Sequence, residues 1–463
     1  MRAAVTLILL RCAPAVGFAA RLAPRAARLR MTMSASSAAS AADRVYVVGG
    51  GAVGCSILYQ LAQRGVPCTL VEGTQVAAAA SGKAGGFLAR NWGDGGPTQA
   101  LHRESFRLHR EWAGELGVTS YRALPTLSVD PDGDMQGGDG RCGWLDGTGS
   151  HQLMATETDT AQISPAEYTN AVYAAAVALG AEHVTGKLVG VDTASDQGAV
   201  SLSGLVLEDG TTLPAERVVF SMGPWTAALE DLLPEGSIKV PMTGIWSTSL
   251  VYGNVAETAQ EPFALFCGED DNGCHLEVYP RPNGEGTFCG AAAAPLPSTT
   301  STRRPARPRP APLTPPEVYC CGLGGSREVN AAALRADDPS PATANDPDPR
   351  RVEAAKATLE GLASWARRES VATTQACMRP CLPDALPMLG KIASVKGAYV
   401  AAGHNCWGIL WAPVTGALMA ELICDKEVSV VPSIKPFSPE RFMPMAGGGR
   451  GRKKGAESVG EQW

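Results

Sequence analysis

No cysteine pattern in this 463-residue chain indicates a zinc site or a disulfide framework. There are 13 cysteines, an odd number, and no two of them have the C-x-x-C spacing. Disulfide frameworks are typical of small secreted domains. We therefore interpret most of these cysteines as buried, reduced thiols that pack as small apolar residues.

An excess of positive charge and a long apolar run are also absent. The formal net charge is −6, which argues against a nucleic-acid partner, because nucleic acid selects for basic domains. Beyond the N-terminal region we predict no segment that crosses a membrane and expect no stable membrane insertion. The length requires two domains, or one discontinuous domain with an insert. The 52 glycines fit a cofactor fold, in which backbone approaches a ligand closely.

Acidic residues are missing from residues 1–42, which hold six arginines and much alanine and serine. This composition is typical of an organelle transit peptide and predicts a plastid or mitochondrial location. The apolar run 5–10 is too short to span a membrane. Two alternatives stay open: a disordered, untargeted segment of a cytoplasmic protein, or a true start at Met31 or Met33.

A glycine fingerprint follows the first predicted strand. Residues 44–48 form an apolar run, as in a buried parallel strand, and residues 49–54 (GGGAVG) satisfy G-x-G-x-x-G. A predicted helix over 52–64 and a second strand over 67–71 complete a β-α-β unit that ends at Glu72. In this context the motif predicts a dinucleotide site.

Each fingerprint residue then has a physical task. Gly49 permits the tight turn, Gly51 lets the backbone approach a pyrophosphate, and Gly54 lets helix and strand pack closely. The N–H groups and partial positive charge at the helix N-terminus face the phosphates. Glu72 can accept hydrogen bonds from a ribose hydroxyl. A single fingerprint at the beginning of the chain, with no second copy, favours FAD over NAD.

Further helices and strands follow from the hydrophobic pattern. Ser164, Pro165 and Glu167 form a helix-opening signal. The predicted helices are 99–116, 165–179, 352–365 and 413–424, and the predicted strands are 121–129, 202–207, 217–220 and 397–402.

The segment 286–316 interrupts this pattern. It contains eight prolines, four arginines and no acidic residue, a composition that predicts disorder. A strand and turn (HLEVYPRPNGE) precede it and another strand (EVYCCG) follows it, so its removal would leave a hairpin. We interpret it as a surface insert or a translated intron. The alternative is a genuine flexible loop.

Four segments together resemble the D-amino-acid oxidase, glycine oxidase and sarcosine oxidase family, in particular a eukaryotic branch of FAD-dependent oxidoreductases within it. They are the fingerprint, 81–86 (SGKAGG), 218–225 (VVFSMGPW) and 403–408 (GHNCWG). The resemblance covers roughly residues 44–435 without the insert. It implies an α/β fold with a discontinuous, Rossmann-like FAD-binding domain and an α+β substrate domain built on an antiparallel sheet.

The implied domains are discontinuous in sequence. They are 43–120, 166–235 and 371–435 for FAD binding, 121–165 and 236–370 for the substrate domain, and 436–463 for a disordered tail.

The resemblance also implies where FAD lies. Residues 81–86 would pass beside the flavin ring, and 403–408 would turn the last strand into the last helix next to the flavin pyrimidine. A helix N-terminus there would stabilise negative charge on reduced flavin. The implied FAD-binding residues are Gly49, Gly51, Ala52, Val53, Gly54, Glu72, Ser81, Gly82, Gly85, Gly86, Gly223, Trp225, Cys377, Gly403, Cys406, Trp407, Gly408 and Ile409. His404 is a catalytic candidate, with a structural turn residue as the alternative.

Cys377 has two interpretations. Its spacing to Asp384 matches that at which sarcosine-oxidase-type members attach FAD covalently, and Arg379 could favour the required thiolate. However, Arg379 stands where an aromatic residue is expected, and Cys381 is a competing thiol. We therefore favour noncovalent FAD with Cys377 as a packing residue. The segment that follows resembles a loop that approaches the flavin, with Ala385 in place of the usual glycine.

The family chemistry transfers a hydride from a neutral amine to flavin, after which the imine hydrolyses and oxygen is the expected acceptor. A carboxylate on the substrate would need an arginine. Arg281 and Arg90 are candidates, with Arg281 better placed, and the alternative is that both are solvated. Tyr279 and Trp246 are candidate lining residues.

We thus predict an FAD-dependent oxidoreductase that oxidises the C–N bond of a small amine or amino acid. Two alternatives stay open: a dehydrogenase that passes electrons to a quinone or protein, and a non-catalytic FAD-binding protein in trafficking.

Overall fold

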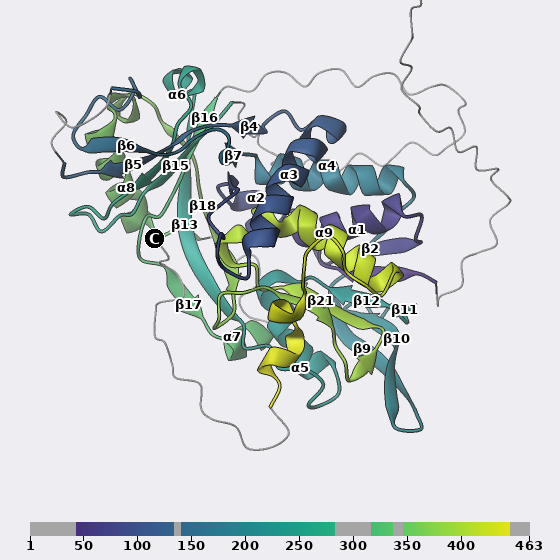
Figure 1. Ribbon diagram of the computed structural model, residues 1–463. Coiled ribbons are helices and arrows are strands. Elements are labelled where there is room, and N and C mark those ends of the chain that lie inside the picture. The colour runs from purple at the N-terminus through teal and green to yellow at the C-terminus, as the bar shows by residue number, and fades with distance from the viewer. Residues whose placement is uncertain (1–42, 134–139, 283–315, 337–345, 445–463) are drawn as a thin grey trace, which may run out of the picture. The chain divides into compact units, whose positions relative to one another are not determined.

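The computed structural model describes residues 43–133, 140–282, 316–336 and 346–444, which belong to one compact unit (Figure 1). The predicted transit peptide and all of the predicted insert except Pro316 lie outside these residues, so both stay predictions.

A six-stranded sheet contains the first predicted strand at its centre. Its order is β19–β21–β12–β1–β2–β8, and all neighbours are parallel except β19, which is antiparallel to β21. The strands are β1 (Val45–Val48), β2 (Cys68–Glu72), β8 (Glu182–Thr185), β12 (Val218–Phe220), β19 (Met388–Lys391) and β21 (Ala398–Ala402). Strands buried on both faces read as continuous apolar runs, which is the pattern of residues 45–48.

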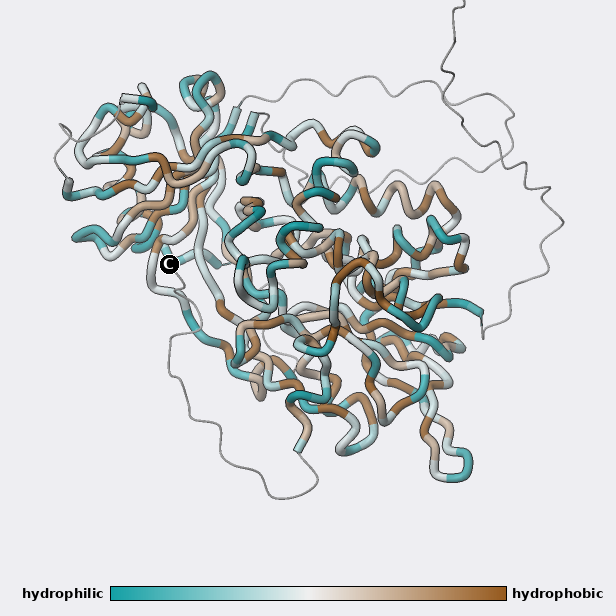
Figure 2. The backbone as a smooth tube through the Cα atoms, in the orientation of Figure 1, coloured by the Kyte–Doolittle hydropathy of each residue, from teal (hydrophilic) through white to brown (hydrophobic). Residues whose placement is uncertain are grey.

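Different elements pack against the two faces of this sheet. Val45 and Val47 of β1 pack into a core with four helices, whereas Tyr46 and Val48 pack into a second core with a smaller sheet. The helices are α1 (Ala52–Gln63), α3 (Gln99–Leu116), α4 (Pro165–Ala178) and α9 (Gly408–Cys424), and the smaller sheet is β9 (Leu188–Asp196), β10 (Ala199–Leu207), β11 (Thr212–Pro214) and β20 (Val395–Lys396). Figure 2 shows apolar chain concentrated in α1 and α9.

A larger, mainly antiparallel sheet forms the other half of the fold. Its order is β17–β13–β16–β15–β14–β5–β6, with β18 on the other side of β13. The strands are β5 (Thr126–Asp130), β6 (Ser150–Ala155), β13 (Thr243–Gly253), β14 (Ala264–Cys267), β15 (Glu277–Arg281), β16 (Glu317–Cys321), β17 (Arg327–Val329) and β18 (Val371–Cys381). Helix α8 (Pro349–Leu362) packs against it in a third core. The predicted fold class is confirmed.

The remaining elements are short. They are a three-stranded sheet of β3 (Phe87–Ala89), β7 (Thr160–Gln162) and β4 (Arg122–Ala123), the helices α2 (Ala80–Lys83), α5 (Leu229–Leu232), α6 (Ala256–Gln260) and α7 (Ala331–Arg335), and the 3₁₀ turns η2 (Gly223–Ala228), η4 (Ser364–Arg367), η5 (Asn405–Trp407), η6 (Lys435–Phe437) and η7 (Pro439–Phe442).

Several sequence predictions are confirmed at the level of elements. The Ser164 hydroxyl accepts a hydrogen bond from the Glu167 N–H, so the predicted cap opens α4. Strands β15 and β16 pair antiparallel, with Arg281 opposite Glu317, so the segments that flank the predicted insert do form a hairpin pair.

Helix α9 begins five residues earlier than predicted, although Pro413 lies inside it. A proline lacks the N–H that would bond to the carbonyl four residues before it, here that of Ile409. In the structure His109 Nε2 lies 2.8 Å from the Ile409 carbonyl oxygen and takes over this bond. A tertiary contact therefore allows the helix to run through its proline.

Other predicted boundaries are wrong. The predicted strand 121–129 is two strands in different sheets, because Pro125, which has no N–H, separates them. The strand β18 pairs with β13 of the large sheet along most of its length, and the predicted domain boundary at residue 371 stays a prediction. The predicted helix 352–365 corresponds to α8, which begins at Pro349 and ends at Leu362.

The predicted tail also starts too early. Residues 436–444 are ordered, because Phe437 is buried and Arg441 pairs with Asp384 at 2.8 Å. The rest of the tail, 445–463, lies outside the described residues.

Within the described residues, 405–424 is the one helical segment long and apolar enough to cross a membrane by composition. Most of it is buried inside the protein, where α9 packs against α1 and α3. Packing in the core therefore accounts for its apolar character.

Candidate active site

A cavity of about 690 Å³ lies where the carboxyl edge of the parallel sheet meets the large antiparallel sheet. The ends of β1, β2, β12 and β21 line one side, and residues of β13, β14, β15, β16 and β18 line the other. Ligands of open α/β sheets bind outside the carboxyl ends of the strands. The fold thus places this cavity where a dinucleotide would be expected.

The fingerprint turn has the backbone geometry that its glycines predict. Gly49 has φ +108°, a conformation that side chains disfavour, and a β-carbon there would collide with the Ser221 carbonyl. A β-carbon on Gly54 would collide with the Gly49 carbonyl oxygen, so only glycine lets α1 start this close to β1. Gly49 and Gly51 line the cavity.

The first turn of α1 offers hydrogen-bond donors to the cavity. The Ala52 N–H donates to Ser81 Oγ at 2.9 Å, whereas the N–H of Val53, which also lines the cavity, donates to no described residue. Glu72 Oε2 accepts from the Gly50 N–H at 2.6 Å, which fixes the carboxylate at the cavity wall. A diphosphate on the helix N-terminus and a hydroxyl on Glu72 would suit these groups.

Most predicted FAD-binding residues meet at this cavity. Those that line it are Gly49, Gly51, Val53, Glu72, Ser81, Gly85, Gly86, Gly223, Trp225, Cys377, Gly403, Cys406, Trp407, Gly408 and Ile409. Ala52, Gly54 and Gly82 do not line it, because Ala52 is buried in the helical core and the two glycines fill tight backbone contacts. That the lining residues touch FAD stays a prediction.

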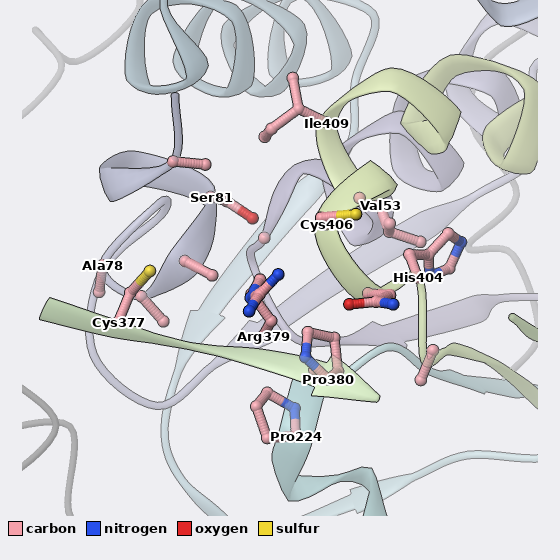
Figure 3. Close-up of a pocket in the computed structure, with 18 of the residues that line it drawn as sticks. Val53, Ala78, Ser81, Pro224, Cys377, Arg379, Pro380, His404, Cys406 and Ile409 are labelled. Carbon is pink, nitrogen blue, oxygen red and sulfur yellow. The ribbon is translucent and has the colours of Figure 1, made fainter. Parts of the chain in front are cut away.

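The backbone of His404 lines the cavity, but its side chain turns away from it, as Figure 3 shows. The imidazole is buried and its Nε2 lies 3.1 Å from Thr415 Oγ1 of α9. Burial lowers the pKa of His404 to about 3, so the ring stays neutral. The structure supports the alternative of a structural turn residue and not a catalytic one.

Neither predicted carboxylate-binding arginine reaches the cavity. Arg281 is buried, donates to the Ala84 carbonyl at 3.0 Å, and places its guanidinium 4.8 Å from the centre of the Tyr319 ring. The strand that contains Arg281, β15, lines the cavity only through Glu277 and Tyr279. Arg90 pairs with Asp159 at 3.1 Å on a half-exposed site.

Of the two predicted aromatic lining residues, one is on the cavity wall. Tyr279 lines the cavity, as predicted. Trp246 does not, because it is buried and Arg327 lies 3.9 Å above its ring. Successive strand residues face opposite sides, so its neighbour Ser247 lines the cavity instead.

Arg379 of β18 is the functional candidate that sequence reasoning placed only as a neighbour of Cys377. It lines the cavity, and Figure 3 shows its side chain between Ser81 and Cys406. Its Nε has no hydrogen-bond partner, and no carboxylate in the described ranges is within salt-bridge distance of it. Strand alternation was the missed signal, since a residue two positions from Cys377 shares its face.

The large sheet adds a carboxylate to the same cavity. Glu277 Oε2 accepts hydrogen bonds from the Tyr279 hydroxyl and from the Cys321 thiol, the latter at 3.4 Å. Burial, reinforced by the charge of Glu277, raises the pKa of Tyr279 and of Cys321 well above their usual values. Both groups therefore stay protonated and keep donating. No motif or spacing in the sequence points to Glu277.

Cys377 has no marked thiolate character. Burial raises its pKa, and the nearby cations Arg379 and Lys83 offset only part of this effect. A covalent bond to flavin needs the thiolate as nucleophile. Burial that keeps the Cys377 thiol protonated thus favours the noncovalent interpretation, which stays a prediction.

A family model matches the chain that carries this cavity. The model of the DAO family, described as FAD dependent oxidoreductase, matches residues 44–422. The chain belongs to this family. The family and its FAD cofactor are therefore those that the sequence motifs predict.

Individual proteins are similar to the FAD-dependent oxidoreductase over most of its length. A Schizosaccharomyces pombe protein named as an oxidoreductase, C1F5.03c, is 27% identical over 415 residues, which are 83% of this chain and 95% of that protein. Glycine oxidase from Geobacillus kaustophilus has a TM-score of 0.64 at 20% identity, covering 87% of this chain and 100% of that one. L-proline dehydrogenase from P. horikoshii has a TM-score of 0.64 at 17% identity, covering 86% and 97%. These two structures show the shared fold.

Proposed function

We propose that this FAD-dependent oxidoreductase oxidises the C–N bond of a small amino acid by hydride transfer to FAD, with oxygen as the final acceptor. The observation that carries the proposal is Arg379, a cation on the cavity wall without a carboxylate partner among the described residues. Two proteins of the same fold are named for amino acids, glycine and L-proline, which supports this class of substrate.

The residues for the cofactor follow from the cavity wall. The N–H groups at the start of α1 would hold the diphosphate, and Glu72 would accept a hydrogen bond from the ribose. The 81–86 and 403–409 segments would border the ring system, and the N-terminus of α9 adds partial positive charge on that side.

Arg379 would hold the carboxylate of the substrate. A guanidinium matches a carboxylate with two parallel hydrogen bonds, and a buried cation without a partner is costly. A substrate carboxylate would therefore offset part of the desolvation penalty of this partly buried guanidinium. Phe266, Tyr279 and Trp407 line the same space with rings that exclude water from the reacting amine.

The test is anaerobic reduction of the purified, FAD-loaded protein by amino acids of both configurations. We expect bleaching of the visible flavin spectrum, and peroxide on admission of air. Bleaching without peroxide would indicate a dehydrogenase that uses another acceptor. A spectrum that no amine or amino acid bleaches would overturn the proposal in favour of a non-catalytic FAD protein.

The role of Arg379 is tested separately. For Arg379→Met we expect kcat/KM for the amino acid to fall about 10- to 150-fold, because a hydrogen bond to a charged group contributes about 1.5–3 kcal/mol. The corresponding amine without a carboxylate should react equally well with both proteins. Arg90→Met is the matched control, because Arg90 lies away from the cavity, and it should leave kcat/KM unchanged. An equal loss with both substrates would contradict carboxylate binding.

A further inference from the structure

The antiparallel sheet presents an ordered row of side chains to the cavity. Glu277 of β15 lies in register with Phe266 of β14 on one side and with Cys321 of β16 on the other. Two residues further along β15, Tyr279 is in register with Tyr319 of β16, and the two rings stack with their centroids 6.2 Å apart. All five side chains line the cavity, so the carboxylate stands among aromatic rings and a thiol.

The carboxylate of Glu277 is held at one oxygen and open at the other. Tyr279 and Cys321 both donate to Oε2, whereas Oε1 accepts from no residue in the described part of the chain. Two donors at one oxygen fix the orientation of the carboxylate group. Oε1 is thus left as an acceptor for a ligand in the cavity.

Glu277 also lacks a cationic partner. Among the described residues no lysine, arginine or histidine is within salt-bridge distance of it. Arg379 lines the same cavity and interacts with Glu277 electrostatically, yet the two side chains form no ion pair. The cavity therefore contains one unpaired positive group and one unpaired negative group, which a ligand with both charges would satisfy together.

The surroundings of Glu277 also favour a positively charged group of a ligand. The faces of aromatic rings attract cations, and Phe266 lies beside Glu277 in register. The rings of Tyr279 and Tyr319 do not add to this attraction, because Phe87, the Tyr279–Tyr319 stack and Arg281 cover their faces. A ligand anion at this place would face the charge of Glu277 and gain nothing from the rings. The end of the cavity at Glu277 is therefore a site for a cation.

The oxidised amine is not that cation. Hydride transfer needs a neutral amine, and a carboxylate beside it would hold it in the ammonium form. We therefore propose that Glu277 binds a second cationic group of the substrate, so that the preferred substrate is an amino acid with a positively charged side chain, such as an ammonium or guanidinium. This inference rests on the proposed function, in which Arg379 binds the carboxylate of the same molecule.

Binding to the FAD-loaded protein tests the inference without relying on turnover. Lysine, arginine, norleucine and glutamate, in both configurations, would be titrated anaerobically while the visible flavin spectrum is recorded. We expect the wild type to bind lysine or arginine about 10- to 150-fold more tightly than norleucine, the range for one added hydrogen bond to a charged group. In Glu277→Gln this preference should largely disappear, while the affinity for norleucine stays within about threefold.

Two further variants serve as controls. Glu328→Gln alters an exposed residue of β17 in the same sheet and should keep the wild-type preference. Glu277→Asp keeps the charge and should retain part of the preference, which a merely structural role of Glu277 would not predict. FAD content and thermal midpoint, measured for every variant, show whether each protein is folded and loaded.

The outcomes separate this inference from the function on which it rests. If norleucine binds as tightly as lysine to the wild type, or if Glu277→Gln keeps the preference, the inference is wrong while amino-acid oxidation stands. If no amino acid of any charge perturbs or bleaches the flavin spectrum, the proposed function fails and the inference fails with it.

Discussion

Ala385 stands in a backbone conformation that favours glycine. Its φ is +57°, in the left-handed region, where a β-carbon costs roughly 1–2 kcal/mol. The backbone at Ala385 is therefore locally strained. We predict that Ala385→Gly raises the free energy of unfolding by about 1 kcal/mol, measured by chemical denaturation.

A matched control separates strain from a general effect of glycine. Ala174 is an exposed residue inside α4, where glycine should lower the free energy of unfolding by about 0.5–1 kcal/mol. If both substitutions change stability in the same direction, strain at Ala385 is not the cause.

Individual site residues were predictable where their role depends on local spacing. Gly49, Gly51 and Glu72 line the cavity because a strand, a turn and a helix of fixed geometry place them there. Arg281 and Arg379 depend instead on which strand segment borders the cavity, and this follows from the register of β15 and β18 in the sheet. Register is a long-range property, so the sequence did not show which strand segment borders the cavity, although alternation along β18 places Arg379 on the same face as Cys377.

At the scale of elements, the contact between α3 and α9 yields a second prediction. His109→Phe removes the donor to the Ile409 carbonyl but keeps a ring against Tyr168. A buried carbonyl left without a partner costs about 1–3 kcal/mol, so the free energy of unfolding should fall by this amount.

The proline provides the control for this prediction. In a Pro413→Ala background the helix N–H returns and can bond to the Ile409 carbonyl, so His109→Phe should cost less than about 1 kcal/mol. The measurement is a double-mutant cycle by chemical denaturation. An equal cost of His109→Phe in both backgrounds would show that the Ile409 bond is not what His109 contributes.

The elements that were predicted correctly carry their own signals. The helix 99–116 has an apolar face and ends at a left-handed Gly117, and α4 has a side-chain cap. The start of α9 was missed because its continuation through Pro413 depends on His109, about 300 residues away in sequence. The ordered segment 436–444 was missed because Arg441 finds Asp384 only in the folded chain.

For the whole molecule, buried histidines around α9 predict acid sensitivity. Burial lowers the pKa of His109 to about 4 and that of His404 to about 3, whereas an unfolded histidine titrates near 6.5. Below about pH 6.5 the unfolded chain therefore binds protons that the folded chain does not. Stability is fully present above this pH and falls as the pH drops toward 4, by on the order of 3 kcal/mol for each histidine.

Chemical denaturation of the FAD-loaded protein between pH 7.5 and about pH 4 would measure this slope. The double variant His109→Phe/His404→Asn removes both groups, so its free energy of unfolding should depend less steeply on pH than that of the wild type, even though it is less stable at pH 7. Because both histidines pack against α9, which begins at the cavity, acid unfolding should release FAD in the same transition. Parallel pH profiles for wild type and double variant would show that other groups, such as paired carboxylates, set the acid limit of this protein.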